Sequence, residues 1–514
     1  MQYPFYFYKM KIKYLIILFC IVQFTYSQNM NSNWCFGDSA GINFANTANP
    51  LPFATSVGSR GSCASISDSN GVLGFYSYNG TTSFDDDTRV CNITNDTVDN
   101  GTRLNGRAFY NQILFVPNVD DTNVFYIFHS GVYTIKGFYF SILDKSANGG
   151  LGKIIVKNAP LIVNNWVGDC LMAIKSGNGK DWWIITKYSN DTGFTYINRF
   201  YIYLVSSSGI SPPIIQDFGN ATDRVLQKIY FNNQGNKLMN INITGLMTEY
   251  DFDRCTGILS NPNIIFPEQT SNIDRWFWEG AYSPNDSLFY ITKNWYTAPN
   301  DTSLLLQFNL FATDIPASCD TLFSVKDPVI LSAIRLAPDG KIYLSNYYNW
   351  GFPGFPYPDS VHNIYNENLS VIEFPNIDGP GCNFTPYSFY LGGKRAYAGL
   401  PNNPNYSLGR LLGSPCDTLQ WVSTPETPNP LQGGLNAGFI VKPNPFLNSV
   451  TISIVDFKNE NWELKIFDVM GKEVLQQKIV REKTDLDLRY LNRGIYFVMV
   501  YDGRSIFTEK VVKL

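Results

Sequence analysis

The stretch MAIKSGNGKDWWII at residues 172–185 contains the pattern that decides the fold. An apolar run at 172–174 is followed by the turn residues Asn178 and Gly179, and then by a second, bulkier apolar run at 182–185. Asn-Gly pairs supply the positive φ angles that a two-residue hairpin turn requires. The stretch therefore predicts two antiparallel strands joined by a tight turn.

The same sequence pattern recurs along the chain, and its turns lie at positions 70, 120, 178, 234, 285, 339 and 392. A period of about 54 residues, built of hairpins without a helical pattern, is typical of a β-propeller. Seven such repeats need about 380 residues, which the segment 28–412 supplies, so we expect a seven-bladed propeller there. Six or eight blades are the alternatives.

The last repeat is incomplete. Its weak hairpin at 389–398 runs out before it reaches outer strands, whereas the apolar runs 34–36 and 40–44 near the other end have the composition of blade strands. We therefore expect the N-terminal segment to complete the last blade and close the ring.

The first 27 residues have the charged, apolar and small-residue order of a secretory signal peptide. The apolar run 15–22 is shorter than the roughly 20 residues of a membrane-spanning helix, so we expect cleavage between Ser27 and Gln28 and no transmembrane helix in the mature chain. Eight of the nine cysteines lie beyond this segment, and an exported chain permits disulfides among them. Eight cysteines allow 105 pairings, which the sequence does not resolve.

Composition changes near residue 440. Charged residues make up about 30% of 441–514 but about 14% of 28–440, and the Pro- and Gly-rich stretch 413–440 between them is expected to be a linker. The tail at 441–514 alternates polar and apolar residues in short runs, which predicts a small Ig-like β-sandwich.

The tail resembles the type A C-terminal sorting domain of the Bacteroidetes type IX secretion system. The matching motifs are KPNPF at 442–446, IFDVMGK at 466–472, LNRGIY at 491–496 and KVVKL at 510–514. Their characteristic residues are Pro443, Asn444, Pro445, Gly471, Gly494, Tyr496 and Lys510. The resemblance implies the type IX secretion machinery as a partner, passage across the outer membrane, and a final location at the cell surface or in the medium.

The large unit resembles propeller proteins that precede this sorting domain in Bacteroidetes. The phrases that carry the resemblance are NWCFG at 33–37, GSCASISDSNG at 61–71, YDFDRCTG at 250–257 and LAPDGKIY at 336–343. This family implies an architecture and a location but no chemistry.

The connections between second and third strands share one face of a propeller, and here they are rich in aromatic residues. Rings on rigid loops stack on sugars or dock a partner chain, so we expect this face to bind a ligand. The candidate residues are Tyr76, Tyr78, Tyr133, Tyr188, Trp295, Tyr296, Tyr348, Trp350 and Tyr357. The competing interpretation is that these rings pack among themselves.

Few residues indicate catalysis or cofactors. The sequence contains two histidines, His129 and His362, so a zinc site with three histidine ligands is excluded. The net charge of −4 does not indicate the basic surface that nucleic-acid binding requires. We interpret the acidic run 85–87 as a solvated turn, with a calcium site as the alternative. We interpret the bulky residues 276–279 as side chains that fill the core near the central channel. We therefore expect no cofactor and no metal, with calcium as the alternative, and we favour a binding protein while the question of an enzyme stays open.

These observations favour an exported propeller that binds a glycan or a protein. The alternative is a carbohydrate-active hydrolase or lyase with acidic or tyrosine catalysts in the central channel, which would need two suitably placed carboxylates.

Overall fold

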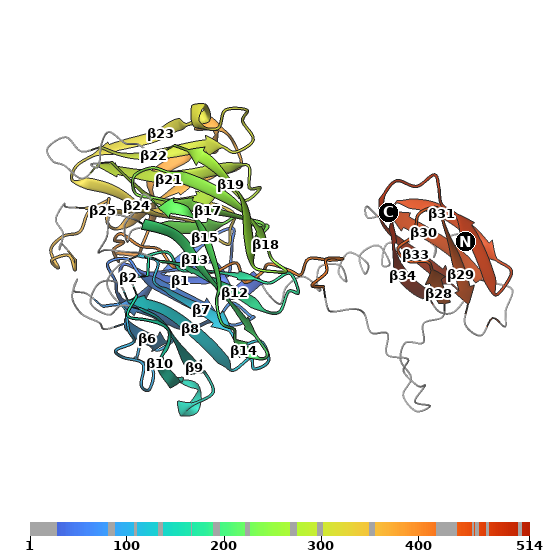
Figure 1. Ribbon diagram of the computed structural model, residues 1–514, viewed down its shortest axis with the longest axis horizontal. Helices are drawn as coiled ribbons and strands as arrows, with labels where there is room; N and C mark the ends of the chain where they lie inside the picture. Colours follow the sequence, from blue (N-terminus) through green and yellow to red (C-terminus); the bar gives the residue numbers. More distant parts are fainter. Residues whose placement is uncertain are drawn as a thin grey trace, which may run out of the picture. The chain divides into compact units, whose positions relative to one another are not determined.

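A computed structural model describes residues 28–514 except 81–87, 107–109, 132–136, 166, 189–195, 222–226, 268–274, 296–301, 349–354, 418–438, 455–456, 458–461, 469–471 and 502–505. The chain forms two compact units that divide between Gln420 and Trp421 (Figure 1). Both units consist almost wholly of antiparallel strands, as the period-two patterns predict.

The first unit contains seven sheets in its described part. The first three are β1 (Asn33–Phe36), β2 (Asp38–Asn43) and β3 (Leu51–Gly58); β4 (Cys63–Ser67), β5 (Leu73–Asn79) and β6 (Thr88–Asn92); and β7 (Ile113–Pro117), β8 (Val124–Gly131), β9 (Gly137–Asp144) and β10 (Lys153–Val163). The fourth contains β11 (Met172–Lys175), β12 (Trp182–Lys187), β13 (Tyr196–Ser206), β14 (Gly209–Ile210) and β15 (Ile214–Ala221).

The remaining three sheets have four strands each. They are β16 (Lys228–Phe231), β17 (Lys237–Ile241), β18 (Met247–Asp253) and β19 (Ile258–Phe266); β20 (Arg275–Tyr282), β21 (Leu288–Trp295), β22 (Thr302–Asn309) and β23 (Asp320–Lys326); and β24 (Val329–Leu336), β25 (Ile342–Tyr348), β26 (Asn368–Ile372) and β27 (Phe384–Tyr390). Four short 3-10 helices, η1 (Gln28–Asn31), η2 (Asn148–Gly150), η3 (Pro316–Ser318) and η4 (Gly379–Cys382), complete the described elements.

The sheets follow one another around a ring. The first strands of neighbouring sheets pack together, from β1 on β4 through to β20 on β24. The ring closes where the β1 to β3 sheet meets the β24 to β27 sheet, because the ring of Tyr343 lies 6.0 Å from Trp34 and 5.6 Å from Phe44. This is the arrangement of a β-propeller, and the number of sheets equals the number of blades expected from the turn spacing.

Two local predictions need correction. The turn glycines do adopt positive φ, as at Gly179 (75°) and Gly340 (79°), but the connections are longer than two residues: 176–181 joins β11 to β12. The hairpin expected at 389–398 does not form. Phe389 instead pairs with Leu369 in the outer strand of the β24 to β27 sheet and packs on Tyr343, which leaves the following residues to pair with the N-terminal sheet.

That pairing supports the expected role of the N-terminal segment. Arg395 forms a bridge with Asp38, in which each backbone N–H donates to the other residue's carbonyl, and the two side chains form an ion pair. The first sheet is thus joined to the chain that follows the last sheet.

The second unit has two sheets around one core. They are β28 (Phe439–Lys442), β29 (Ser449–Ile454) and β32 (Lys483–Asp487), and β31 (Glu473–Ile479), β30 (Trp462–Asp468), β33 (Gly494–Tyr501) and β34 (Ile506–Lys513). Alternate residues such as Val450, Ile452, Leu464 and Val498 are buried between the sheets. This is the small β-sandwich that the alternation predicts, and its Ig-like topology stays a prediction.

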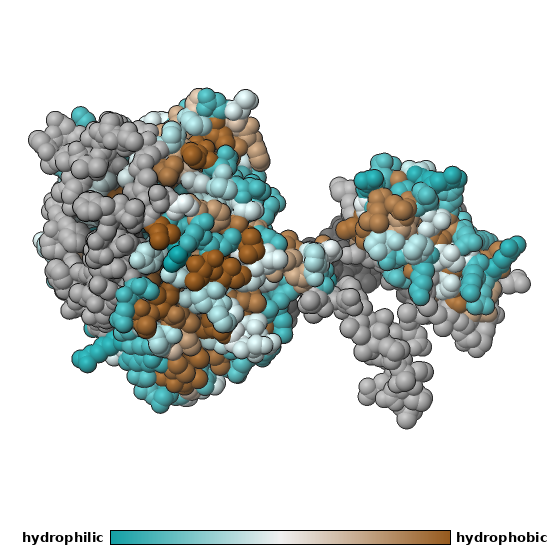
Figure 2. All heavy atoms as spheres, viewed as in Figure 1, coloured by the Kyte–Doolittle hydropathy of each residue, from teal (hydrophilic) through white to brown (hydrophobic). Residues whose placement is uncertain are grey.

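The outer surface of the propeller mixes polar and apolar side chains. Large apolar residues are exposed on outer strands, among them Ile155 and Val163 on β10, Ile215 on β15 and Ile264 on β19. On the face seen in Figure 2, apolar atoms lie in separate patches among polar ones. The described part of this face therefore presents several separate apolar patches and not one continuous patch.

A buried histidine makes the propeller sensitive to acid. His129 on β8 is fully buried, with Nδ1 2.6 Å from the Asn105 carbonyl oxygen and Nε2 3.0 Å from the Ser141 hydroxyl. Burial lowers the pKa of His129 to about 4, against about 6.5 in an unfolded chain. Below pH 6.5 the unfolded chain binds a proton that the folded one does not, so stability falls as the pH falls towards 4.

We expect this histidine to remove about 2 kcal/mol of the free energy of unfolding between pH 7 and pH 5. Urea unfolding of the wild type and of His129→Gln at both pH values measures it, because the variant lacks the titrating group. An equal loss in both proteins would show that other groups cause the acid sensitivity.

Candidate functional site in the propeller channel

The first strands of the sheets bring polar residues to the centre of the ring. Lys228 opens β16, Glu279 lies on β20 and Arg335 on β24, while Asn111 and Asp169 stand just before β7 and β11. All except Arg335 are buried, and the Arg335 side chain is 12% exposed. We call these five residues the channel cluster.

Asp169 and Lys228 form the first half of the cluster. The Lys228 ammonium donates to Asp169 Oδ2, and the backbone N–H groups of Tyr110 and Asn111 donate to Asp169 Oδ1 at 3.1 and 2.7 Å. Lys228 Nζ also lies 5.1 Å from the centre of the Tyr110 ring and 5.7 Å from that of Trp278, within cation-π range. Both charges are therefore compensated despite complete burial.

Glu279 and Arg335 form the second half. The Arg335 guanidinium donates to Glu279 Oε2 and, at 2.7 Å, to Asn111 Oδ1. Tyr230 O–H donates to Glu279 Oε2 at 3.0 Å, and the Asn111 amide donates to Oε1 at 3.1 Å. Burial lowers the pKa of Arg335, but the attraction of Glu279 outweighs it and leaves that pKa above its ordinary value. Burial, reinforced by Glu279, raises the pKa of Tyr230.

The cluster contains two carboxylates and two cations, and the carboxylate oxygens of Asp169 and Glu279 accept hydrogen bonds from protein donors. A general acid needs a proton to release, and a nucleophile needs an open face. The arrangement instead joins the first strands of several sheets through charge-assisted hydrogen bonds. In this arrangement the described oxygens of both carboxylates are engaged by protein donors.

A second feature of the channel is the segment 395–417, which we call the strap. It runs beside β4 in the same direction: Ala398 donates its N–H to the Arg60 carbonyl at 3.0 Å, and Asn402 donates to that of Cys63 at 2.9 Å. The Asn402 side chain also donates to the carbonyls of Ile113 (3.3 Å) and Leu171 (2.8 Å). One asparagine thus joins three neighbouring sheets.

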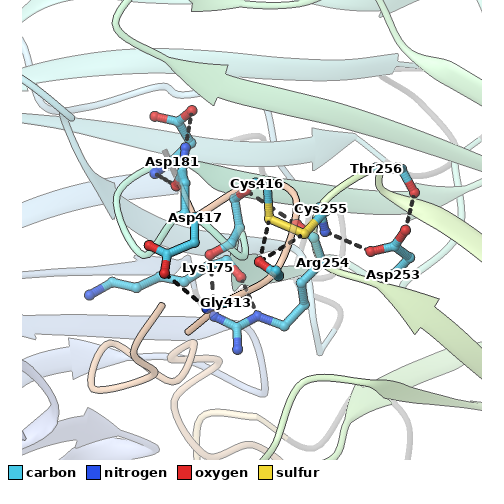
Figure 3. The surroundings of a disulfide bond; sticks show 12 residues. Lys175, Asp181, Asp253, Arg254, Cys255, Thr256, Gly413, Cys416 and Asp417 are labelled. Atoms are coloured by element: carbon cyan, nitrogen blue, oxygen red, sulfur yellow. Dashed lines mark hydrogen bonds between the residues drawn. A yellow bond between two sulfur atoms is a disulfide. The ribbon is translucent and has the colours of Figure 1, made fainter. Parts of the chain in front are cut away.

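Beyond Asn402 the strap reaches the mouth of the channel where the first strands end. Tyr406 is buried and donates its hydroxyl to the Phe115 carbonyl at 3.0 Å, and the Leu411 N–H donates to the Gly177 carbonyl at 2.7 Å. A disulfide between Cys255 and Cys416 then fixes the strap to the connection between β18 and β19 (Figure 3). The compact unit therefore extends past the expected linker boundary at residue 412.

Arg254 supports the same anchor. Its Nε donates to the Lys175 carbonyl at 2.8 Å (Figure 3). Its Nη2 donates to the carbonyls of Ser176 and Gly409, and its own carbonyl accepts from the Trp183 indole. The other described cysteines, at 35, 63, 91, 170, 319 and 382, are free.

A cavity of about 430 Å³ opens at this mouth. The last residues of several first strands line it, such as Ile174, Phe231, Tyr282 and Leu336, together with 403–407 of the strap. Six asparagines line it: Asn29, Asn31, Asn232, Asn233, Asn403 and Asn405. Among the described residues that line it, Arg335, which is paired with Glu279, is the one charged side chain.

The aromatic residues singled out in the sequence lie elsewhere. Of those that the structure describes, Tyr76 and Tyr78 lie on β5, Tyr188 directly follows β12, Tyr348 ends β25, and Tyr357 lies in the connection between β25 and β26, and none of these five lines the cavity. Tyr76 is fully buried with its hydroxyl 2.6 Å from Ser56 Oγ, Tyr78 is buried beside it, and Tyr357 is buried against Tyr397. These three rings pack within the propeller.

Two others are partly exposed. Tyr188 packs at the edge of the core that contains Trp182, and Tyr348 stacks on Tyr365 with ring centres 5.8 Å apart. Tyr133, Tyr296 and Trp350, the side chain of Trp295, and the acidic run 85–87 lie outside the described residues. A glycan surface on the aromatic loops stays a prediction that rests on Tyr188 and Tyr348.

In the tail, the motif residues join its two ends. Asn444 Oδ1 accepts the Val512 N–H at 3.0 Å, and Phe446, which follows Pro443 and Pro445, is buried and exchanges backbone bonds with Val512 and Leu514. Tyr496 donates its hydroxyl to the Asn492 carbonyl at 2.8 Å. Gly494 begins β33 and Lys510 lies on β34, while Gly471 is outside the described residues.

The molecule is thus an all-β protein in which a propeller precedes a separate two-sheet tail. Residues 441–514 match the family model for the secretion system C-terminal sorting domain, which confirms the assignment made from the four motifs. The chain carries a type IX sorting tail and is marked for export. No curated protein matches the sequence. The described residues include no helix with the length and hydropathy needed to span a membrane.

Solved structures similar to this chain include PorZ, a surface component of the type IX secretion system of Porphyromonas gingivalis (11% identity, 93% of this chain and 73% of that one, TM-score 0.26). Others are an endo-arabinase from Bacteroides thetaiotaomicron (11%, 46% and 88%, 0.30) and the Cps50 (Swd1) β-propeller domain of Myceliophteria thermophila (8%, 63% and 97%, 0.32). Likeness at this level says nothing about a shared ligand or reaction.

Sequence reasoning missed the channel cluster. Its members are separated by about one repeat each, and Lys228 and Glu279 stand within otherwise apolar strand runs. A charged residue in such a run is the available signal, because an isolated charge is rarely buried without a partner. The partners themselves depend on how the ring closes.

Proposed function

We propose that this protein is an exported, non-catalytic binding protein that holds a neutral glycan in the channel-mouth cavity. The signal peptide, cleaved between Ser27 and Gln28, carries the chain into the periplasm, and the sorting tail then delivers the propeller through the type IX machinery to the cell surface or the medium. The observation that carries the proposal is the contrast between a charge-balanced channel and an open cavity lined by amides.

The chemistry of the cavity supports a neutral polar ligand. Asparagine side chains both donate and accept hydrogen bonds, as sugar hydroxyls do, and Asn29 and Asn31 are partly exposed at its rim. Phe44, Tyr282 and Tyr406 add aromatic surface to the lining. A few polar groups within a partly apolar concave surface are typical of small-ligand sites. With Arg335 already engaged by Glu279, the lining offers no unpaired charge for an anion.

Binding to a neutral-glycan array, followed by calorimetric titration with the best glycan, tests the proposal. Ala45 is exposed and lines the cavity, so Ala45→Trp fills the opening without entering the core, and we expect at least a tenfold loss of affinity. Ala48, which is exposed on the same loop but outside the lining, provides the control Ala48→Trp. Equal affinities of the two variants, or no glycan bound, would exclude this site.

The same titrations examine the aromatic loops. If Tyr188→Ala and Tyr348→Ala weaken binding while Ala45→Trp does not, the ligand occupies the aromatic loops instead. Release of new reducing ends from a polysaccharide by the wild-type protein would favour the hydrolase or lyase alternative. Binding without turnover supports the proposal.

Removal of the tail is expected to block export. A chain ending at residue 440 lacks every sorting motif but keeps the whole propeller, so it should accumulate in the periplasm, whereas the full chain reaches the surface or the medium. Cell fractionation with immunodetection, alongside a periplasmic marker protein, measures this. Equal amounts of both chains outside the cell would show that the tail is not needed.

A further inference from the structure

The strap contributes a wall of the cavity, and its attachment to the ring is uneven along its length. Residues 403–407 line the cavity. On the N-terminal side, two asparagines attach the strap to β4. The Asn402 N–H donates to the Cys63 carbonyl, and the Ser65 N–H donates to Asn403 Oδ1 at 3.0 Å. On the far side, the exposed Ser407 donates its N–H and hydroxyl to Asn405 Oδ1 within the strap, and the chain continues to Cys416.

The far side depends on a small anchor. It includes the Leu408 side chain, which packs on the core cluster that contains Ile174 and Ile229, the Leu411 N–H, which donates to the Gly177 carbonyl, Arg254, which donates to the Gly409 carbonyl, and the disulfide to Cys255. Leu412, Gly413 and Pro415 are exposed, so these residues between Leu411 and Cys416 add little apolar burial to the anchor. Both cysteines of the pair are partly exposed, and a reductant in solution can reach them.

We propose that the strap is a redox-locked wall of the ligand cavity: the site takes its binding shape only when the disulfide between Cys255 and Cys416 holds 407–412 against the ring. This inference rests on the proposed function for the ligand, and on the strap geometry for the lock. A protein made for export meets an oxidising compartment after it leaves the cytoplasm. The disulfide would accordingly form in that compartment and complete the cavity, whereas the strap would stay loosely attached while the chain is in the cytoplasm.

The locking step is a two-electron oxidation. The thiols of Cys255 and Cys416 each lose a proton and together give two electrons to a disulfide oxidant, such as oxidised glutathione, which becomes two thiols as the new S–S bond forms. Because the pair closes a separation of 161 residues, it restricts a large loop of the chain.

Hydrogen exchange on the full chain tests the lock without any ligand. The samples are the oxidised wild type, the wild type reduced by a phosphine, the double variant Cys255→Ser/Cys416→Ser, and the control Cys319→Ser, which removes a partly exposed free thiol. We expect exchange in peptides covering 407–412 to rise at least tenfold on reduction and in the double variant, while β24 peptides and the control stay unchanged. Exchange within twofold of the oxidised wild type would overturn the lock.

Titration with the glycan selected on the array then tests the wall. If the lock shapes the site, reduction lowers affinity at least tenfold, and reoxidation restores it in the wild type but not in the double variant. If reduction loosens the strap but leaves the affinity for the glycan unchanged, the strap has no role in binding. If the oxidised wild type binds no glycan, the proposed function fails, while the exchange measurement still decides the lock. Should the double variant not fold, the reduced wild type gives the same comparison.

Discussion

Arg335→Met is expected to lower the free energy of unfolding of the propeller by about 3–5 kcal/mol. The substitution keeps the length of the side chain but removes the guanidinium that pairs with Glu279 Oε2 and Asn111 Oδ1. Glu279 would then remain buried with the Lys228 ammonium at 3.9 Å as its nearest cation. Chemical unfolding followed by tryptophan fluorescence measures the change.

Two further variants make the result specific. Lys153 and Asp99 form an ion pair of 2.8 Å with both side chains about half exposed, so Lys153→Met should leave the unfolding midpoint unchanged within error. In the double variant Arg335→Met/Glu279→Gln no unpaired carboxylate is left, and the loss should be smaller than in Arg335→Met alone. A double variant less stable than the single one would show that the cluster does not act through charge compensation.

Gly399→Ala is expected to cost about 3 kcal/mol, at the upper end for overpacking of a core. A Cβ atom at this position would stand 1.9 Å from the Gly61 carbonyl oxygen and 2.4 Å from its carbon. Both obstacles are backbone, so the strap has to leave β4 or the start of β4 has to move. Loss of stability should therefore come with faster hydrogen exchange at the Ala398 amide, which bonds to Arg60, and at the Asn402 amide, which bonds to Cys63 at the start of β4.

The strap itself provides the control. A Cβ at Gly409 would meet no atom within 4 Å, so Gly409→Ala should stay within about 0.5 kcal/mol of the wild type. Similar losses in the two variants would mean that the close approach to Gly61 does not hold the strap. Chemical unfolding and hydrogen exchange on the same samples separate these outcomes.

The sequence was most informative where the determining interactions are local. In LAPDGKIY at 336–343, Asp339 and Gly340 make the turn and the flanking apolar residues end β24 and begin β25, all within a few positions. Hairpins of this kind reveal the repeat, and the repeat reveals the propeller. The sorting tail was predictable for a similar reason, because its four motifs occur in order within 74 residues.

Features that depend on partners distant in the sequence could not be predicted. The Gly-Gly pair at 392–393 imitates a blade turn, yet Phe389 finds better packing on Tyr343, some 46 positions away, than a hairpin would offer. The strap has no period, and its asparagines bond to carbonyls that only the closed ring brings together. Likewise, which of the eight cysteines pair is decided by where the strap ends, not by their spacing.

The path of the strap has a consequence for how the chain folds. Its bonds join residues 289 positions apart at Asn402, 291 at Tyr406 and 338 at Asn403, so nearly the whole propeller has to be synthesised before any of them can form. Contacts of such high sequence separation are late and slow events in folding. Cys416 lies beyond all of these strap residues, so its bond to Cys255 can close only after the whole propeller sequence has been synthesised.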